Sequence, residues 1–526
     1  MIELAKMSKS INKITFFIFL SFIFLASIYR ILGITINHPF WVDEFSSANQ
    51  ARLLLDKGLG VFNNPNIVFD AYNVGYHTII ALFFNLFGES EFVARLPSVI
   101  IGSIIPALVF LVGYRLFNRT TGVIAGLLST TSYFLITWSR QARAYAFAQF
   151  FILITLLLYL EITERKTKSP LLFTLLIIFI ACGLLIHPLY SLFIVSLGIH
   201  FFIINRNKIK TWIRNPLFYV ITIFLGCALY LSNFLSILLG ADSGEGLIKA
   251  NNIWYYHSFL WREHMLITYL FILGIFFLML ENRRKFLLIF IYICLHLIFI
   301  LFLFSPYISR YLLPVWPFIL LLCGYALFNI ASQLSKKTSI PTVMIGIFLT
   351  LIIIINGHKF VFKPKSFYSV NHDFREIALI DYNSIYSIIK QKGHLDDGKT
   401  AVIDTWHDRI YWYLGSHYSA TYLFRWQNDK DTTNGLLRKT FFVYNNNGEK
   451  ILPRQKDLRF IGELKDLKIA MQKYARGFIF IDDNTMPKDV IHYVETHFKK
   501  ELYLDHYPSD DNPYSIWPAT LYSWGI

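Results

Sequence analysis

Long apolar stretches recur along the first two thirds of the chain, and they restrict its fold more than any other feature. A helix needs roughly 20 apolar residues to cross a hydrocarbon core about 30 Å thick, and many of these stretches approach that length. Only 16% of the 526 residues are charged, whereas soluble domains carry roughly 25%. The sequence therefore predicts an all-α polytopic membrane protein over most of its length.

Hydropathy predicts about 11 or more membrane-spanning helices. We expect them near 14–35, 92–114, 120–137, 145–161, 170–187, 190–204, 216–238, 264–280, 286–304, 311–331 and 340–357. A further apolar segment at 72–87 is short, and we expect it to be an interfacial or re-entrant helix on the outer face. If it crossed the membrane, every later basic loop would change sides.

The basic loops give the expected orientation, because Lys and Arg are enriched in cytoplasmic loops. With the spans above, all the main basic clusters fall on one side, so the N-terminus is predicted to be cytoplasmic in a plasma membrane. The clusters also explain the net charge of +15 without nucleic acid as a partner. They contain Lys6, Lys9, Lys13, Arg115, Arg119, Arg165, Lys166, Lys168, Arg206, Lys208, Lys210, Arg214, Arg283, Arg284, Lys285, Lys336 and Lys337.

The composition changes after residue 357, where Asp, Asn, Lys and Tyr become frequent and the apolar runs shorten. The stretches "TAVIDT" and "GFIFIDD" predict short buried strands, and "KDVIHYVETHFKKE" predicts an amphipathic helix. We therefore expect a transmembrane domain at 1–357, with a long external loop at 36–91. A soluble extracytoplasmic α/β domain is expected at 358–526.

The predicted external loops contain an acidic pair and several arginines. The pair is Asp43 and Glu44 in "WVDEF", shortly after the first span. Arginine presents a planar fork of donors that suits phosphate oxygens, so the arginines favour an anionic ligand such as a lipid phosphate. Anchoring at the headgroup level is the alternative. The arginines and their neighbouring tyrosines are Arg140, Arg143, Tyr145, Arg262, Arg310 and Tyr311.

The acidic pair suggests chemistry on an acceptor. A carboxylate can act as a general base on an incoming hydroxyl or amine. The alternative is a solvated pair that helps to start the helix at "FSSANQARLLL". Because there is no nucleotide pool outside the cell, an activated donor used there would have to be held in the membrane.

Several short motifs occur in an order that is typical of one group of membrane enzymes. They are "WVDE", "FDAYNVGYHTIIALFFNLFG", "FVARLPSVIIGSI", "RQARAYA" and "RYLLPVWP", within about residues 14 to 320. In this order they resemble the GT-C glycosyltransferases, in particular the branch of protein O-mannosyltransferases and aminoarabinose–lipid A transferases. The resemblance implies a GT-C fold and transfer of a hexose or pentose from a polyprenyl-phosphate donor.

The resemblance also implies roles for individual residues. Asp43 would be the catalytic base, and Glu44 would orient the acceptor or shape the loop. The polyprenyl phosphate would leave with inversion at the anomeric carbon. Relatives often have a His-Pro-Pro-like turn after a second acid, whereas this chain reads "AYNVGY" there, which puts the role of Asp70 in question. The expected acceptor or sugar contacts are Asp70, Tyr76, His187 and Tyr190.

The expected partners are the polyprenyl-phosphate sugar donor, membrane lipids, and an acceptor glycan, lipid or protein. No cofactor and no metal are predicted, because the first loop lacks Asp-x-Asp and no His cluster has ligand spacing. Some GT-C enzymes use a divalent cation near the acids, so the sequence does not exclude a divalent cation. A transporter or flippase would place ionisable residues near the middle of spans. A polymerase or ligase of surface polysaccharide would differ only in its acceptor.

Overall fold

The structure, a computed structural model, divides the chain into two compact units. The helical unit comprises Met1–Thr35, Asp70–Phe83 and Phe92–Tyr368, and the α/β unit comprises Ile36–Phe69, Phe84–Glu91 and Ser369–Ile526. The described residues are 13–62, 73–165, 169–208, 250–415, 421–424, 443–452, 455–482, 487–510 and 512–526, with three isolated residues between 209 and 249.

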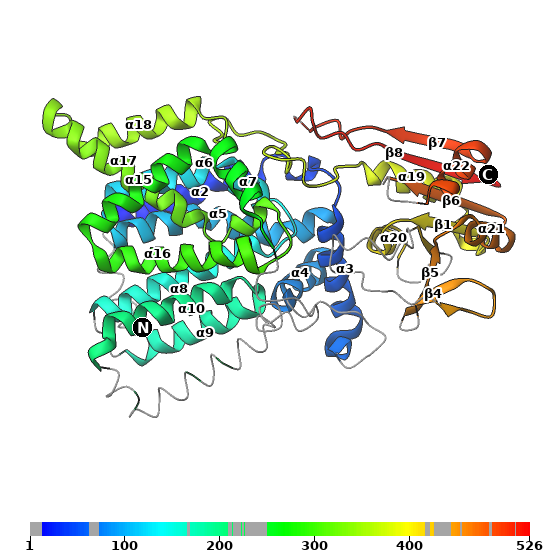
Figure 1. Ribbon diagram of the computed structural model, residues 1–526, viewed down its shortest axis with the longest axis horizontal. Coiled ribbons are helices and arrows are strands. Elements are labelled where there is room, and N and C mark those ends of the chain that lie inside the picture. Colours follow the sequence, from blue (N-terminus) through cyan, green and yellow to red (C-terminus); the bar gives the residue numbers. More distant parts are fainter. Residues whose placement is uncertain are drawn as a thin grey trace. The chain divides into compact units, whose positions relative to one another are not determined.

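The helical unit consists of apolar helices that run side by side (Figure 1). The described helices are α2 (Lys13–Ile31), α5 (Glu91–Leu116), α6 (Arg119–Thr131), α7 (Tyr133–Ser139), α8 (Tyr145–Arg165), α9 (Pro170–Ile186), α10 (Tyr190–Asn205), α14 (Ile253–His257), α15 (Met265–Glu281), α16 (Arg283–Ile298), α17 (Trp316–Thr338) and α18 (Thr342–Asn356). Helix α4 (Val74–Phe87) covers the short apolar segment and has residues in both units.

The predicted spans coincide with helices, but the predicted number of about 11 is not confirmed. Among the described residues, five helices are long and apolar enough to cross a membrane, or six if a pair bent by 100° at His264 is one span. The expected span at 120–137 is broken, because Ser132 caps the start of α7 and forms a β-bridge with Phe360. The expected span at 216–238 lies outside the described residues.

Close backbone approach holds α15 against α17. A methyl group added at Gly274 would overlap the carbonyl oxygen of Leu322, so only glycine allows this contact. Small residues at such contacts are typical of helices packed in membranes.

Gly274→Ala is therefore expected to destabilise the helical unit by about 1–3 kcal/mol, the usual cost of overpacking. Gly198→Ala is the matched control, because a methyl group at Gly198 on α10 would meet nothing within 4 Å. Thermal unfolding in detergent should show a lower Tm for Gly274→Ala only. Equal Tm values for the two variants would contradict this packing account.

Polar and aromatic contacts join several helix ends at one end of the helical unit. Arg115 near the end of α5 pairs with Glu161 near the end of α8, at 3.1 Å. The ring of Phe117 stacks on that of Tyr325 in α17, with centroids 4.5 Å apart. The Tyr325 hydroxyl in turn donates to Glu281 at the end of α15. The C-terminal ends of α5, α8 and α15 therefore meet beside α17.

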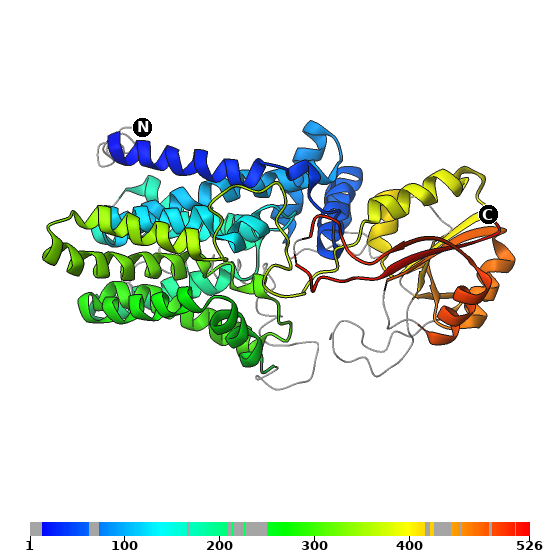
Figure 2. The same ribbon diagram turned by 90° about the horizontal axis from the view of Figure 1, so that it is seen from above.

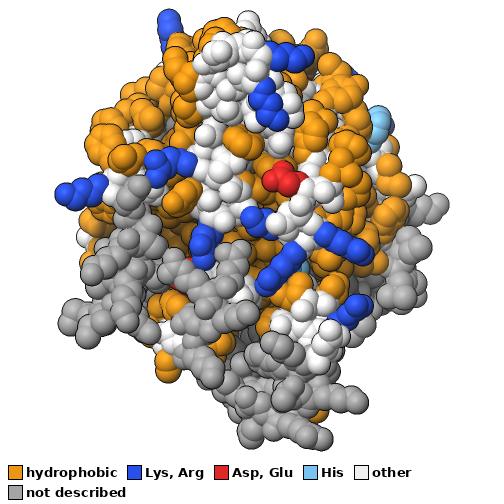
Figure 3. Space-filling model, turned by 90° about the vertical axis from the view of Figure 1, so that its left-hand side faces the viewer, with side chains coloured by type: hydrophobic (Ala, Val, Ile, Leu, Met, Phe, Trp, Pro, Cys, Tyr) orange, Lys and Arg blue, Asp and Glu red, His pale blue; other side chains and the backbone are white. Residues whose placement is uncertain are grey.

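The described basic residues of the predicted cytoplasmic clusters lie at the same end, which we call the basic end. Arg119 at the start of α6 lies 3.5 Å from Thr15 of α2, and His200 of α10 contacts the Arg284 carbonyl of α16. Figure 3 shows Lys and Arg side chains spread over this end, with hydrophobic side chains around it. The predicted cytoplasmic loops therefore gather together, as the positive-inside rule requires. The basic residues are Lys13, Arg115, Arg119, Arg206, Arg283, Arg284, Lys285, Lys336 and Lys337.

The orientation of this end stays a prediction, and cysteine labelling can test it. In a cysteine-free background, an impermeant reagent should label Tyr444→Cys in intact cells, because Tyr444 is exposed in the predicted external domain. Lys337→Cys should be labelled only after the cells are permeabilised. Labelling of Lys337→Cys in intact cells would contradict the predicted orientation.

The α/β unit is built on an eight-stranded sheet of order β3-β4-β5-β2-β1-β6-β8-β7. The central strands β5, β2, β1 and β6 are parallel, whereas β3, β4, β7 and β8 add antiparallel pairs at the edges. The strands are β1 (Thr400–Asp404), β2 (Thr421–Phe424), β3 (Val443–Tyr444), β4 (Lys450–Leu452), β5 (Gln455–Ile461), β6 (Arg476–Ile481), β7 (Lys499–Leu504) and β8 (Ala519–Trp524). The two predicted strands are confirmed as β1 and β6.

Helices cover both faces of this sheet (Figure 2). Ala401 and Ile403 of β1 pack in one core with α21 (Leu464–Lys473) and α22 (Lys488–His497), the predicted amphipathic helix. On the other face, Tyr382 of α19 (Tyr382–Lys392) contacts the ring of Phe480 in β6. The apolar residues of β1 and β6 are buried on both faces, as is usual for parallel strands.

Part of the predicted external loop belongs to the α/β unit. Residues 36–69 group with the C-terminal residues, and they contain helix α3 (Val42–Lys57). Helix α3 packs on α20 (His407–Leu414), which follows β1. The predicted domain division at residue 357 stays a prediction, but the acidic pair lies in the same compact unit as the sheet.

Candidate active site

The predicted arginines include two that lie at the other end of the helical unit from the basic end. Helices α8 and α17 run toward the basic end, and Arg143 and Arg310 lie just before their first residues. At 1.5 Å per residue, these helices of 21 and 23 residues are about 31 and 35 Å long. The two arginines are therefore separated from the basic end by about the thickness of a hydrocarbon core.

Hydroxyl groups fix the backbone that carries Arg143. Ser98 of α5 donates to the Arg143 carbonyl oxygen at 3.0 Å. The Ser98 hydroxyl also bonds the Tyr76 hydroxyl of α4 at 2.8 Å. Tyr76 is buried, and through Ser98 it supports the turn before α8, so its expected role as a sugar contact stays a prediction.

Aromatic rings surround the same turn. The ring centroid of Tyr145 lies 5.0 Å from that of His187 and 6.0 Å from that of Trp138. His187 is the residue directly after α9, and its side chain interacts electrostatically with those of Arg143 and Arg310. Residues from three loops, at 138–145, 187 and 310, therefore come together.

Arg310 completes this group, which we call the arginine–aromatic cluster. Its guanidinium carbon lies 5.8 Å from the Trp138 ring centroid and 5.5 Å from that of Tyr311. The Tyr311 carbonyl contacts Nε2 of His296 at 2.7 Å, which fixes the backbone beside Arg310. The cluster consists of Trp138, Arg143, Tyr145, His187, Arg310 and Tyr311. Arg310 beside aromatic rings, with Arg143 nearby, can bind an anionic group and an apolar chain at once.

Arg140, whose role as a donor ligand stays a prediction, contacts backbone carbonyls and an aromatic ring in the structure. Its guanidinium donates to the carbonyl oxygens of Leu32 and Ser366, both at 2.7 Å. It also lies 4.9 Å from the ring centroid of Tyr368, and its side chain is fully buried. Arg140 therefore ties the end of α2 and the 366–368 segment to the turn after α7.

Two further predicted residues lie apart from these contacts. The side chain of Arg262 is 79% exposed, next to Glu263. Tyr190 is buried between α8, α9 and α10, where its hydroxyl bonds that of Thr155 at 2.7 Å. Asp70 lies outside the described residues.

The acidic pair lies in the first turn of α3. The helix begins at Val42, so both acids are close to the positive end of its dipole, as expected if they help to start a helix. Asp43 is half-buried, whereas Glu44 is fully buried within the α/β unit. The predicted exposed loop is in fact a helix terminus, which can hold a carboxylate in a fixed position.

Sequence reasoning missed Ser98, Trp138 and His296. Trp138 is adjacent in sequence to the motif that contains Arg140 and Arg143, so that motif could have indicated it. Ser98 and His296 lie inside apolar helices, and no local pattern distinguishes them from ordinary core residues.

Comparisons with known proteins agree with this architecture. A family model described as dolichyl-phosphate-mannose-protein mannosyltransferase matches residues 74–235. The crystal structure of ArnT from Cupriavidus metallidurans matches with a TM-score of 0.57 at 12% identity, over 96% of this chain and 97% of that chain. The chain therefore resembles the GT-C glycosyltransferases: a mannosyltransferase family model matches part of it, and its fold is similar to that of ArnT.

A second solved structure has a similar fold. The oligosaccharyltransferase AglB from Archaeoglobus fulgidus matches with a TM-score of 0.54 at 11% identity, over 95% of this chain and 74% of that chain. No curated protein matches the sequence significantly. With its apolar helices and GT-C fold, the chain is a multi-pass membrane protein, and the predicted resemblance is confirmed.

Proposed function

We propose that this protein is a GT-C glycosyltransferase, which transfers a sugar from a polyprenyl-phosphate donor to a lipid, glycan or protein acceptor on the extracytoplasmic face of the plasma membrane. The observation that carries the proposal is the arginine–aromatic cluster at the end opposite the basic end. Arg310 lies beside two of its four rings, and both Arg310 and Arg143 interact electrostatically with His187. If the basic end is cytoplasmic, this cluster lies at the outer surface, where a lipid phosphate would be found.

The comparisons support the proposed class of donor. ArnT from Cupriavidus metallidurans has been crystallised bound to undecaprenyl phosphate, and AglB from Archaeoglobus fulgidus in complex with dolichol phosphate. Both ligands are long isoprenoid chains that end in a phosphate. Two arginines with paired donors and adjacent aromatic rings suit this combination.

In the proposed reaction, Asp43 accepts the proton of an acceptor hydroxyl or amine. The acceptor atom attacks the anomeric carbon, and the bond between that carbon and the phosphate oxygen breaks. The phosphate oxygen keeps the bonding electrons, and Arg143 and Arg310 stabilise its developing charge. A single displacement of this kind inverts the anomeric centre. Glu44, buried beside Asp43, shapes the first turn of α3.

The direct test is the purified protein in detergent with polyprenyl-phosphate sugars of several kinds. We expect release of polyprenyl phosphate and a sugar that is covalently attached to an added acceptor. A flippase would move the lipid between leaflets of a liposome without breaking the sugar–phosphate bond. Transbilayer movement without any bond cleavage would therefore contradict the proposal and favour the transporter.

A further inference from the structure

The α/β sheet has a topological switch point between β1 and β6. The chain proceeds from β1 to β2 on one side and returns with β6 on the other side of β1. In open α/β sheets, ligands usually bind in the crevice outside the strand ends at such a point. Here Asp404 ends β1 and Asp482 directly follows β6, so two carboxylates meet at this crevice.

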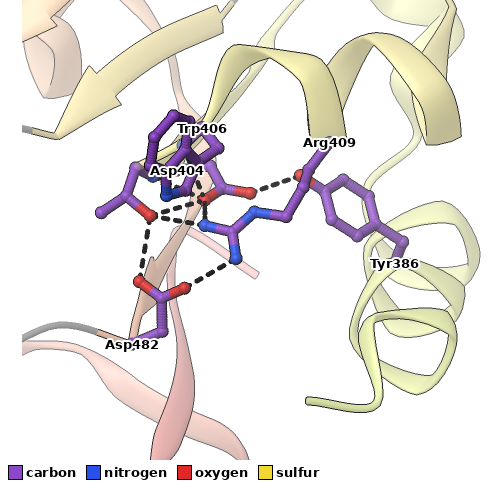
Figure 4. A network of polar contacts seen from close by, with 6 residues as sticks. Tyr386, Asp404, Trp406, Arg409 and Asp482 are labelled. Carbon is purple, nitrogen blue, oxygen red and sulfur yellow. Dashed lines mark hydrogen bonds and ion pairs between the residues drawn. The ribbon is translucent and has the colours of Figure 1, made fainter. Parts of the chain in front are cut away.

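The chain's own Arg409 occupies this position (Figure 4). Its guanidinium bonds Asp404, and its Nη1 lies 2.6 Å from Oδ2 of Asp482. The side chains of Arg409 and Asp404 are 1% exposed, and that of Asp482 is 8% exposed. The charges that could bind a ligand are therefore paired with one another.

Other donors occupy the remaining carboxylate oxygens. The Tyr386 hydroxyl donates to Oδ2 of Asp404 at 2.6 Å. The backbone N–H of Thr405 donates to Oδ1 of Asp404 at 2.5 Å, and the Thr405 hydroxyl donates to Oδ1 of Asp482 at 3.0 Å. Burial raises the pKa of the Asp482 carboxyl, and Arg409 offsets part of that rise. We call Asp404, Arg409 and Asp482 the strand-end network.

Aromatic contacts connect the strand-end network with helix α3. The guanidinium carbon of Arg409 lies 4.6 Å from the ring centroid of Tyr382. The ring of Phe45, the residue after Glu44, lies 5.8 Å from that of Tyr382 and 5.6 Å from that of Tyr413. Tyr382 therefore lies between the network and the first turn of α3.

Further contacts attach α3 to α20 along its length. Asn49 donates to the Asp408 carbonyl oxygen at 2.8 Å, and Arg52 donates to that of Tyr411 at 3.1 Å. The Arg52 guanidinium also lies 4.5 Å from the ring centroid of Trp412. Helix α3 is thus held by side chains from more than one of its turns.

We propose that the α/β unit positions the acidic pair, with the strand-end network fixing α20 and α19 so that they hold the first turn of α3. This inference rests on the proposed role of Asp43 as the base. Arg409 and Tyr382 are then positioning residues, because they act through Phe45 and α3. Placement matters for catalysis, since a shift of about 1 Å at a reacting group can cost on the order of 100-fold in rate.

The test compares Tyr382→Leu with Lys450→Met. Tyr382→Leu removes the ring between Arg409 and Phe45, and we expect kcat to fall about 10-fold with the donor KM within about twofold of wild type. Lys450 is a matched control, because it is buried in the same sheet and pairs with Asp466 at 3.0 Å. Loss of general stability would lower the activity of both variants, whereas a positioning role predicts the loss for Tyr382→Leu only.

A double-mutant cycle with Asp43→Asn makes the test specific. If Tyr382 acts by placing the Asp43 carboxylate, Tyr382→Leu should have almost no further effect on the residual turnover of Asp43→Asn. A full tenfold loss in that background, or an unchanged kcat in the single variant, would overturn the positioning role. Near-normal turnover of Asp43→Asn alone would instead overturn the proposed base.

A second variant covers the case in which Tyr382→Leu does not fold. Asn49→Ala removes one bond between α3 and α20 and leaves the sheet untouched. We expect a smaller loss in kcat, about threefold, that also disappears in the Asp43→Asn background. An Asn49→Ala variant with wild-type kcat would contradict the proposal on its own.

Discussion

Asp43→Asn is expected to lower turnover by roughly 100-fold or more, the usual scale for loss of a general base. The amide has nearly the same shape as the carboxylate but cannot accept the acceptor's proton. Asp43 is half-buried in the first turn of α3, and its backbone carbonyl accepts a bond from the Ser47 hydroxyl. That contact remains in the variant, so the folded α/β unit should lose no more than about 0.3–1 kcal/mol from the weaker helix-dipole interaction.

The measurement is release of polyprenyl phosphate in detergent, with thermal unfolding curves recorded on the same samples. Asp56→Asn is the matched control, because it makes the same change at an exposed position near the other end of α3. It should keep wild-type turnover. Glu44→Gln should have a milder effect than Asp43→Asn if Glu44 only shapes the helix start. Equal loss in Asp43→Asn and Asp56→Asn would indicate a general effect of charge on α3.

Arg143→Ala is expected to lower kcat/KM for the lipid-phosphate donor by roughly 10- to 100-fold. This range corresponds to the loss of a hydrogen bond to a charged group, worth about 1.5–3 kcal/mol. Arg143→Lys should restore only part of the activity, since a point charge lacks the planar fork. Arg310→Ala should act in the same direction, because its guanidinium lies in the same cluster.

Kinetics and donor binding should be measured together for these variants. Arg206→Ala is the control, because it removes an exposed arginine at the basic end. It should leave kcat/KM unchanged. If Arg143→Ala binds a polyprenyl-phosphate sugar as tightly as wild type does, the arginine–aromatic cluster does not hold the phosphate.

The parts of the fold that follow from local sequence could be predicted. The length of the apolar stretches predicted the positions of α2, α5, α8 and α17, and the amphipathic pattern of "KDVIHYVETHFKKE" predicted α22. The break at Ser132 could not be predicted, because it depends on a bridge to Phe360, more than 200 residues later in the chain. The predicted number of spans is not confirmed, because several apolar helices among the described residues are shorter than a full crossing.

The site was predictable as a set of residues but not as an arrangement. Arginines on the unexpected side of the membrane indicated Arg143 and Arg310. In the structure both interact electrostatically with His187, and Arg310 lies beside Trp138. The same signal also indicated Arg140, whose contacts with Leu32 and Ser366 are structural. The contacts that each arginine makes depend on residues that are distant in sequence. No local motif contains those residues.

The sequence also contained no indication that α3 belongs to the α/β unit. Phe45 and Asn49 contact Tyr413 and Asp408, more than 350 residues away in the chain. Aromatic and amide side chains in a predicted loop give no indication of such distant partners. The link between the acidic pair and the C-terminal sheet therefore emerges only from the folded chain.

Mass spectrometry of envelope lipids and glycans tests the central claim most directly. It should compare cells that produce wild-type protein, cells that produce Asp43→Asn at the same level, and cells without the protein. The account predicts that a sugar-bearing lipid, glycan or protein is present only with the wild type, and that the polyprenyl-phosphate sugar donor accumulates in the other two strains. Identical products and identical donor levels in all three strains would contradict the claim that this protein transfers sugar from a polyprenyl phosphate.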